Sequence, residues 1–160
     1  MDVTPEERLA ALGLDLPPPP QPAGQYRPAR LVGDTLYLSG QGPRHPDGSF
    51  VAGRLGEDVS TQAGRTAARD AGLRLLSAAR HALGNLSRIA AVGRVFGMVH
   101  AAPGFTEHAA VIDGCSELFI SVLGEAGHHS RSVAGLATLP YGMIVQIDAV
   151  LHILPKEKLQ

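Results

Sequence analysis

The 160-residue chain has 14 basic and 15 acidic side chains, a formal net charge of −1 at pH 7 with neutral histidine, and 44% hydrophobic residues. This length and apolar content suffice for one hydrophobic core, and the scattered charges lack the basic stripe typical of proteins that bind nucleic acid. The lone Cys115 excludes an intramolecular disulfide, and no apolar run reaches the roughly 18 residues of a membrane helix. We therefore expect one cytoplasmic domain with neither nucleic-acid nor membrane partners.

Residues 1–25 are predicted to form an N-terminal arm ahead of a single domain over residues 26–155. Residues 5–12 favour a short helical turn. Residues 16–22 read LPPPPQP, and because proline fixes φ and has no N–H, this tract should be extended. We interpret it as a rigid spacer on the surface.

Alternating residues from position 29 predict two antiparallel strands joined by a turn at Gly33-Asp34. The glycines and prolines of residues 40–48 predict a loop that can form one wall of a site. Apolar residues at every third or fourth position predict helices over residues 61–83 and 106–123. Cys115 lies in the apolar stripe of the second helix, so we interpret it as a core residue rather than a nucleophile.

Three more strands are predicted, over residues 89–102, 130–138 and 144–153, and we expect the last two to pair antiparallel. In the final strand one face is wholly apolar, while Gln146 and Asp148 lie on a mixed face typical of an interface or small pocket. The element order predicts an α+β fold with two helices on one face of a mixed sheet. The uncovered sheet face predicts a homo-oligomer.

Arg131 is the first candidate functional residue. Its guanidinium is always protonated, lies among small and apolar neighbours, and matches a carboxylate through two parallel hydrogen bonds. It therefore needs an anion: either an acidic ligand, or an internal partner such as Asp148, Glu125 or an acid of a neighbouring subunit. His128 and His129 should point to opposite sides of the chain and lie on the surface, and the other histidines show no ligand spacing, so we expect no metal and no cofactor.

Four segments together resemble the RidA/YjgF family, whose best-known members are reactive-intermediate deaminases acting on 2-imino acids. They are residues 24–26 (GQY), 38–43 (LSGQGP), 131–140 (RSVAGLATLP) and 144–150 (IVQIDAV). The resemblance spans residues 23–153, and the long arm is similar to that of a subgroup of larger chains. It implies a chorismate-mutase-like fold and a homotrimer with a central barrel and ligand clefts between subunits.

The resemblance also implies a role for individual residues in the cleft. Arg131 would grip the substrate carboxylate, Tyr26 would close the cleft beside it, and Ser39 and Gly40 would line the wall. Gln146 replaces a glutamate that is thought to orient or activate the attacking water in the family. A glutamine can hold water but cannot accept its proton.

Two further positions depart from the family pattern: Asp113 replaces an asparagine and Val133 replaces a cysteine. We count Asp113 and Val133 among the predicted ligand-binding residues. Arg131 and Gln146 are the predicted catalytic residues. The first functional hypothesis is hydrolysis of small 2-imino acids to 2-keto acids and ammonia. The second is non-catalytic binding of a small carboxylate, a hypothesis favoured by the presence of Gln146 in place of the glutamate. RNA cleavage, a label attached to some relatives, ranks third because the chain shows no basic groove and few aromatic residues.

Overall fold

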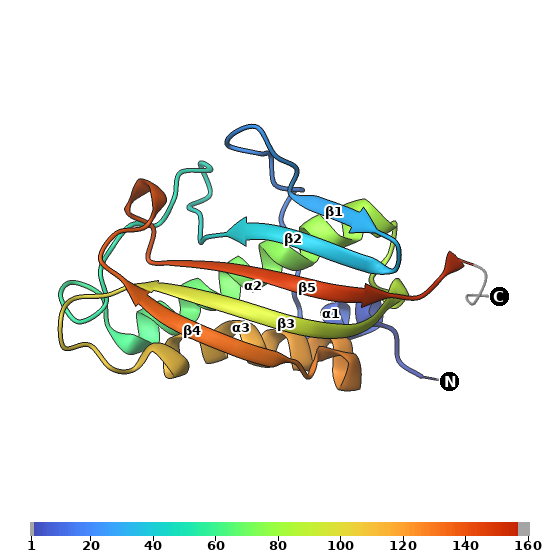
Figure 1. Ribbon diagram of the computed structural model, residues 1–160. Coiled ribbons are helices and arrows are strands. Elements are labelled where there is room, and N and C mark those ends of the chain that lie inside the picture. Colours follow the sequence, from blue (N-terminus) through green and yellow to red (C-terminus); the bar gives the residue numbers. More distant parts are fainter. Residues whose placement is uncertain (1, 157–160) are drawn as a thin grey trace.

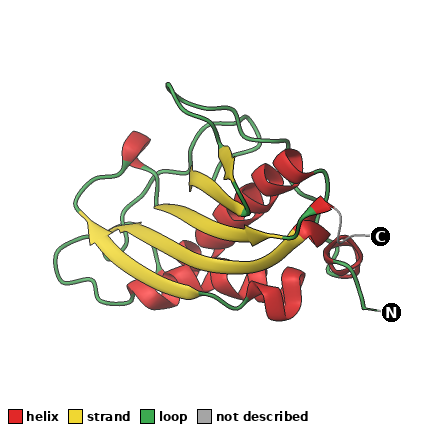
Figure 2. Ribbon diagram, turned by 45° about the vertical axis from the view of Figure 1, so that its right-hand side comes forward, coloured by secondary structure: helices red, strands yellow, loops and turns green. Residues whose placement is uncertain are grey.

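The computed structural model describes residues 2–156 and contains one sheet with helices on one of its faces (Figure 1). Figure 2 shows the second face of the sheet free of helices. The elements in chain order are α1 (Pro5–Ala11), β1 (Ala29–Val32), β2 (Thr35–Gln41), α2 (Thr61–Leu83), η1 (Leu86–Arg88), β3 (Ile89–His100), α3 (His108–Leu123), η2 (Gly124–Gly127), β4 (Ser130–Leu136), η3 (Pro140–Gly142) and β5 (Val145–Ile153). The predicted α+β class, mixed sheet and open face are confirmed.

The sheet has the order β1-β2-β5-β3-β4, so the prediction that the last two strands pair is wrong. β4 pairs in parallel with β3 at the sheet edge, and β5 lies antiparallel between β2 and β3. The predicted hairpin of β1 and β2 is confirmed, with Val32 opposite Thr35.

Burial explains why β5 and not β4 occupies the centre. Every second residue of β5 is buried, from Val145 to Ile153, whereas Ser130 and Ser132 of β4 are exposed, as suits an edge strand. The segment between the two strands passes the end of β3, where the His100 amide donates to the Ile144 carbonyl over 2.9 Å. The short connection between β4 and β5 therefore crosses the end of β3 instead of closing a hairpin.

α2 and α3 lie side by side under the sheet and bury their apolar stripes against it. Ser60 caps α2 by accepting a hydrogen bond from the Ala63 amide, and Gly84 ends the helix. A Cβ at Gly72 would lie 2.9 Å from the Leu118 side chain, so glycine allows the two helices to approach closely. Cys115 is buried in this layer, as predicted. No helix within residues 2–156 is long and apolar enough to cross a membrane.

The arm contributes to the core as well as to the surface. α1 is the predicted short helical segment, begun by a capping box of Thr4 and Glu7, and its Leu9 is buried with the residues of the main core. The proline tract then runs along α2, where the Ser77 hydroxyl donates to the Pro17 carbonyl over 2.5 Å.

Candidate functional site

Four of the predicted site residues meet in one pocket at the adjoining ends of β2 and β5. Tyr26, Ser39, Gly40 and Gln146 all line this hollow of about 470 Å³, which we call the Gln146 pocket. The sheet register places Gln146 opposite Met98, on the face that carries no helices. The pocket therefore opens away from the helical layer.

Local contacts fix the walls of the Gln146 pocket. The Ser39 hydroxyl donates to the Arg27 carbonyl over 2.7 Å, and the Tyr26 hydroxyl accepts from the Ala23 amide over 3.1 Å. A Cβ on Gly40 would lie 2.6 Å from Nε2 of Gln146, so the strand backbone lies directly against the glutamine amide. Any larger residue at position 40 would displace Gln146.

Asp148 lines the same pocket, two residues along β5 from Gln146. Burial raises the pKa of its carboxyl above the ordinary value, and the nearby Arg94 guanidinium partly opposes the rise. A carboxyl with a raised pKa is a better proton acceptor than an ordinary aspartate at the same place, so Asp148 is a second polar group available to a bound water.

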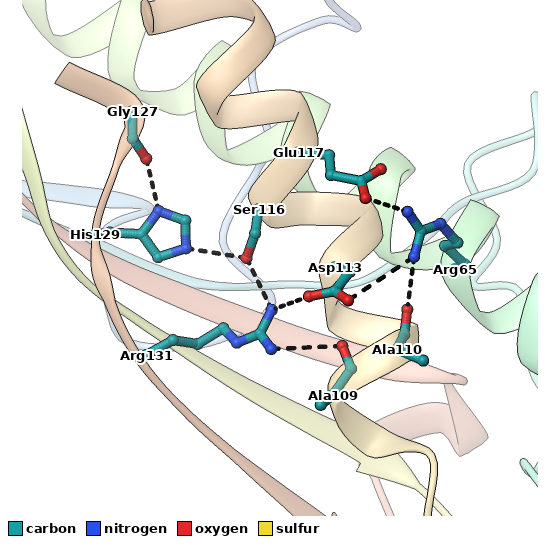
Figure 3. Close-up of polar contacts among 9 residues, drawn as sticks. All are labelled: Arg65, Ala109, Ala110, Asp113, Ser116, Glu117, Gly127, His129 and Arg131. Atoms are coloured by element: carbon teal, nitrogen blue, oxygen red, sulfur yellow. Dashed lines mark hydrogen bonds and ion pairs between the residues drawn. The ribbon is translucent and has the colours of Figure 1, made fainter. Parts of the chain in front are cut away.

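Arg131 lies elsewhere, between β4 and α3, and is held by an internal aspartate (Figure 3). Its Nη1 donates to Oδ1 of Asp113 over 2.8 Å and to the Ser116 hydroxyl over 3.0 Å, and its Nη2 lies 3.5 Å from the Ala109 carbonyl. The internal partner is thus Asp113, and not Asp148 or Glu125 as the sequence suggested. The pairing of Arg131 with Asp113 results from the packing of α3 against β4, which a sequence pattern does not reveal.

Ser116 and His129 complete the support of Arg131 (Figure 3). His129 Nδ1 lies 2.6 Å from the Gly127 carbonyl, which can only accept, so Nδ1 carries the hydrogen. In the neutral ring Nε2 then accepts from the Ser116 hydroxyl at 2.9 Å, while the serine oxygen accepts from Arg131. His129 is half-buried and bonded at both nitrogens, so it does not have the surface role that the sequence predicted. Sequence reasoning missed Ser116, although its spacing of three from Asp113 places both on one helix face.

Asp113 is shared by two arginines. Its second oxygen, Oδ2, lies 3.9 Å from Nη1 of Arg65, and Arg65 also pairs with Glu117 (Figure 3). Two flanking cations hold the Asp113 carboxylate on α3, so a ligand that binds Arg131 need not displace it.

Val133 and Cys115 are neighbours of Arg131 that offer packing rather than chemistry. Val133 lies two residues along β4 from Arg131, and its side chain is partly buried against the main core. Burial raises the pKa of the Cys115 thiol to about 12, so no thiolate forms near neutral pH.

The two predicted catalytic residues lie on opposite faces of the sheet. In the sheet register, Arg131 lies opposite Val95, whose side chain is buried in the core between the sheet and the helices. Gln146 lies opposite Met98, on the open face. Paired residues in a sheet share a face, so Arg131 and Gln146 of one chain cannot contact the same small ligand. One chain presents two halves of the predicted site.

An aromatic cluster beside the Gln146 pocket was not predicted. The rings of Phe50 and Tyr141 stack with centroids 5.0 Å apart, and the Arg44 guanidinium lies 3.9 Å from the Phe50 centroid. All three side chains line the pocket. From the sequence, the segments near Phe50 and Tyr141 were predicted only as a loop and a turn. Nothing local in either segment indicates that the two rings meet. Within residues 2–156, no cluster of three or more His, Cys, Asp or Glu residues is placed to hold a metal ion.

Replacing Ser116 by alanine is expected to lower the free energy of unfolding by about 1–2 kcal/mol, because the nearly buried hydroxyl bridges Arg131 and His129. Denaturant unfolding of the purified variant measures the change. The exposed Ser121→Ala on the same helix is the matched control and should change stability by less than about 0.5 kcal/mol. Equal stability of the two variants would show that the bridge contributes nothing.

Comparison with known proteins agrees with this architecture. Residues 6–150 match the family model described as "YjgF/chorismate_mutase-like, putative endoribonuclease". Protein TCP17 of Trypanosoma cruzi is 37% identical over 158 residues, covering 96% of this chain and 99% of its own length. The crystal structure of a "putative endoribonuclease" from Shewanella oneidensis MR-1 is 34% identical with a TM-score of 0.90, over 94% of this chain and 99% of that one.

A more distant likeness is to TdcF of E. coli, whose structure was solved with bound serine. It is 20% identical with a TM-score of 0.59, over 84% of this chain and 92% of that chain, which shows a shared fold only. The near-complete match to the family model, together with the sheet order and the extent of the TCP17 alignment, settles the classification. The chain belongs to the YjgF/chorismate-mutase-like family.

Proposed function

We propose that this protein binds small 2-imino and 2-keto carboxylic acids in clefts between subunits of a homotrimer, and hydrolyses the imines slowly. Each cleft takes Arg131 from one subunit and the Gln146 pocket from the next. The observation that carries the proposal is the separation of Arg131 and Gln146 on opposite faces of one sheet. Two copies are needed to bring both to one ligand.

The open sheet face supports the assembly. Tyr37 is 49% exposed there, and Val150, Phe96 and Met98 are half-buried beside it. Apolar side chains on an uncovered sheet face favour association with a second copy of the chain. Asp148 lies on the same face, where further burial by a partner would raise its pKa again.

Arg131 retains the donors that a carboxylate needs. Among the described residues, Asp113 and Ser116 engage Nη1, and Nη2 makes one long contact with Ala109. A guanidinium has five N–H donors, so Nε and the second hydrogen of Nη2 remain for the two oxygens of a carboxylate. The internal pair with Asp113 therefore orients the guanidinium and leaves one edge for the ligand.

The chemistry at the Gln146 pocket is addition of water to a protonated imine. The water oxygen bonds to the imine carbon, the C–N bond breaks, and the products are the 2-keto acid and ammonium. Gln146 can hold this water, but the proton must pass to another acceptor, for which Asp148 is the candidate in the pocket. The electrophile is already cationic, so the reaction proceeds without a strong base, only more slowly. The serine bound by TdcF, an amino acid with a carboxylate, supports a ligand of this class.

The test follows binding and turnover in the same preparation. Calorimetric titration should detect 2-oxobutanoate and not the neutral 2-oxobutanamide. Decay of enzymatically generated 2-iminobutanoate, followed by semicarbazide trapping, should exceed the spontaneous rate. Light scattering should give the mass of three chains. A preparation that binds neither acid nor imine, or one that stays monomeric while active, would overturn the proposal.

A further inference from the structure

A second and larger hollow, of about 970 Å³, lies beside the Gln146 pocket. One wall is the proline tract, residues 17–22, and the other is formed by residues 44–46 and 48–50 with Arg74 and Tyr141. We call this hollow the proline groove. The groove and the Gln146 pocket have these lining residues in common: Gln21, Ala23, Arg44, Phe50 and Tyr141. A molecule seated against Gln146 can therefore extend into the groove while remaining in contact with protein.

The proline wall is apolar except for Gln21 and is held in place at both ends. Proline has a fixed φ and no N–H, so this stretch of backbone offers few donors and little freedom to move. The Ser77 hydroxyl anchors the Pro17 carbonyl over 2.5 Å, and the Tyr26 hydroxyl holds the Ala23 amide over 3.1 Å. A wall fixed in advance loses little conformational freedom when a ligand binds.

The opposite wall presents a flat aromatic surface. Phe50 and Tyr141 stack with an interplanar angle of 17°, and Arg44 lies over the Phe50 ring, which leaves Tyr141 as the outer member of the stack. Tyr141 is 67% exposed. Its φ of 58° is in the left-handed region that favours glycine, and such backbone outliers cluster at functional sites. The fold thus holds an unfavourable backbone conformation at an aromatic residue that contributes little to the core.

We propose that the ligand is a 2-imino or 2-keto acid with an aryl or similarly flat apolar side chain, whose ring lies in the proline groove beside Tyr141. This inference rests on the proposed function and specifies its substrate class. The carboxylate and the reacting carbon occupy the smaller Gln146 pocket, and the side chain extends between the proline wall and the aromatic wall. An acid with a side chain of one or two carbons would leave the groove to water.

The test compares affinities of full-length protein for pyruvate and phenylpyruvate by calorimetric titration. Phenylpyruvate should bind at least about tenfold more tightly than pyruvate, since filling an apolar subsite contributes a factor of this size. Adenosine monophosphate is titrated as a second flat ligand that lacks the 2-keto acid group.

Two variants test where the preference arises. Pro18→Glu places a charge at a residue that lines the groove and not the Gln146 pocket, and should bring the ratio of the two affinities close to one. Tyr141→Gly removes the ring at a position whose backbone suits glycine, so folding is preserved, and should also lower the ratio severalfold. Pro103→Glu, at an exposed proline outside both hollows, is the control and should keep the wild-type ratio.

The outcomes separate this inference from the proposed function. If pyruvate binds and phenylpyruvate binds no better, the groove does not select the side chain and the inference fails alone. If Pro18→Glu and Tyr141→Gly keep the wild-type ratio, the preference comes from elsewhere and the inference also fails. If no 2-keto acid binds, the proposed function fails with it. Binding of adenosine monophosphate without phenylpyruvate would assign the aromatic surface to a nucleobase instead.

Discussion

Arg131→Ala is expected to lower affinity for 2-oxobutanoate about a hundredfold, because the ligand carboxylate loses two charge-assisted hydrogen bonds. Gly40→Val should have a comparable effect, since a side chain at position 40 collides with Gln146. Co-expression of the two variants should restore activity to about a quarter of all clefts. At that frequency, random mixing of equal amounts places an intact Arg131 beside an intact pocket. Differently tagged chains allow the mixed assemblies to be isolated and assayed by semicarbazide trapping, and within these mixed trimers about one cleft in three should be active.

The matched control combines two variants of the same half-site. Gly40→Val mixed with Gln146→Ala should recover nothing, because every cleft then contains a damaged pocket. Arg131→Ala loses its bonds to Asp113 and Ser116 and should be somewhat less stable than wild type. Each single variant must still unfold cooperatively at a temperature well above that of the assay, which excludes general loss of structure. If Arg131→Ala and Gly40→Val form mixed assemblies without recovery, the two half-sites do not meet in one cleft.

Gln146→Glu is expected to accelerate imine hydrolysis about a hundredfold, because a carboxylate in place of the amide can accept the proton of the attacking water. Affinity for 2-oxobutanoate should stay within a few fold of wild type, since the carboxylate of the ligand is held by Arg131. Single-turnover decay of 2-iminobutanoate, measured at equal site occupancy, separates the chemical step from binding.

Asp148→Asn distinguishes a slow enzyme from a binder. If Asp148 takes the proton in the wild-type protein, Asp148→Asn lowers the residual rate and has little effect once Gln146→Glu is present. If wild type and Asp148→Asn both match the spontaneous rate while Gln146→Glu exceeds it, the natural protein binds its ligand without turnover. A Gln146→Glu variant as slow as wild type would show that position 146 does not face the reacting carbon.

The sequence was a reliable guide wherever structure depends on neighbours along the chain. Helix α2 occupies the predicted residues 61–83, since its apolar period, its serine cap and Gly84 are all local signals. The alternation of β5 likewise predicted which of its residues are buried. Relationships between distant segments were not predictable in the same way. The pairing of β4 depends on which strand occupies the centre of the sheet, and the local turn at Pro140 carries no information about that choice.

The same division holds for the candidate site. Arg131, Tyr26, Ser39, Gly40 and Gln146 were predicted from their types and from the family resemblance, because the chemistry of a side chain is a property of the residue itself. Contacts that join residues far apart in the chain were decided by packing in three dimensions.

Tertiary structure alone gave Arg131 its partner on α3, stacked Phe50 on Tyr141, and placed the proline tract across a groove. It also set Arg131 and Gln146 on opposite faces, because strand order and register fix which side of the sheet each residue occupies. Composition and periodicity determine which segments form helices and strands and which faces are apolar. The free energy that selects one strand order and one set of long-range contacts comes from burying all these faces together, and no single segment contains it.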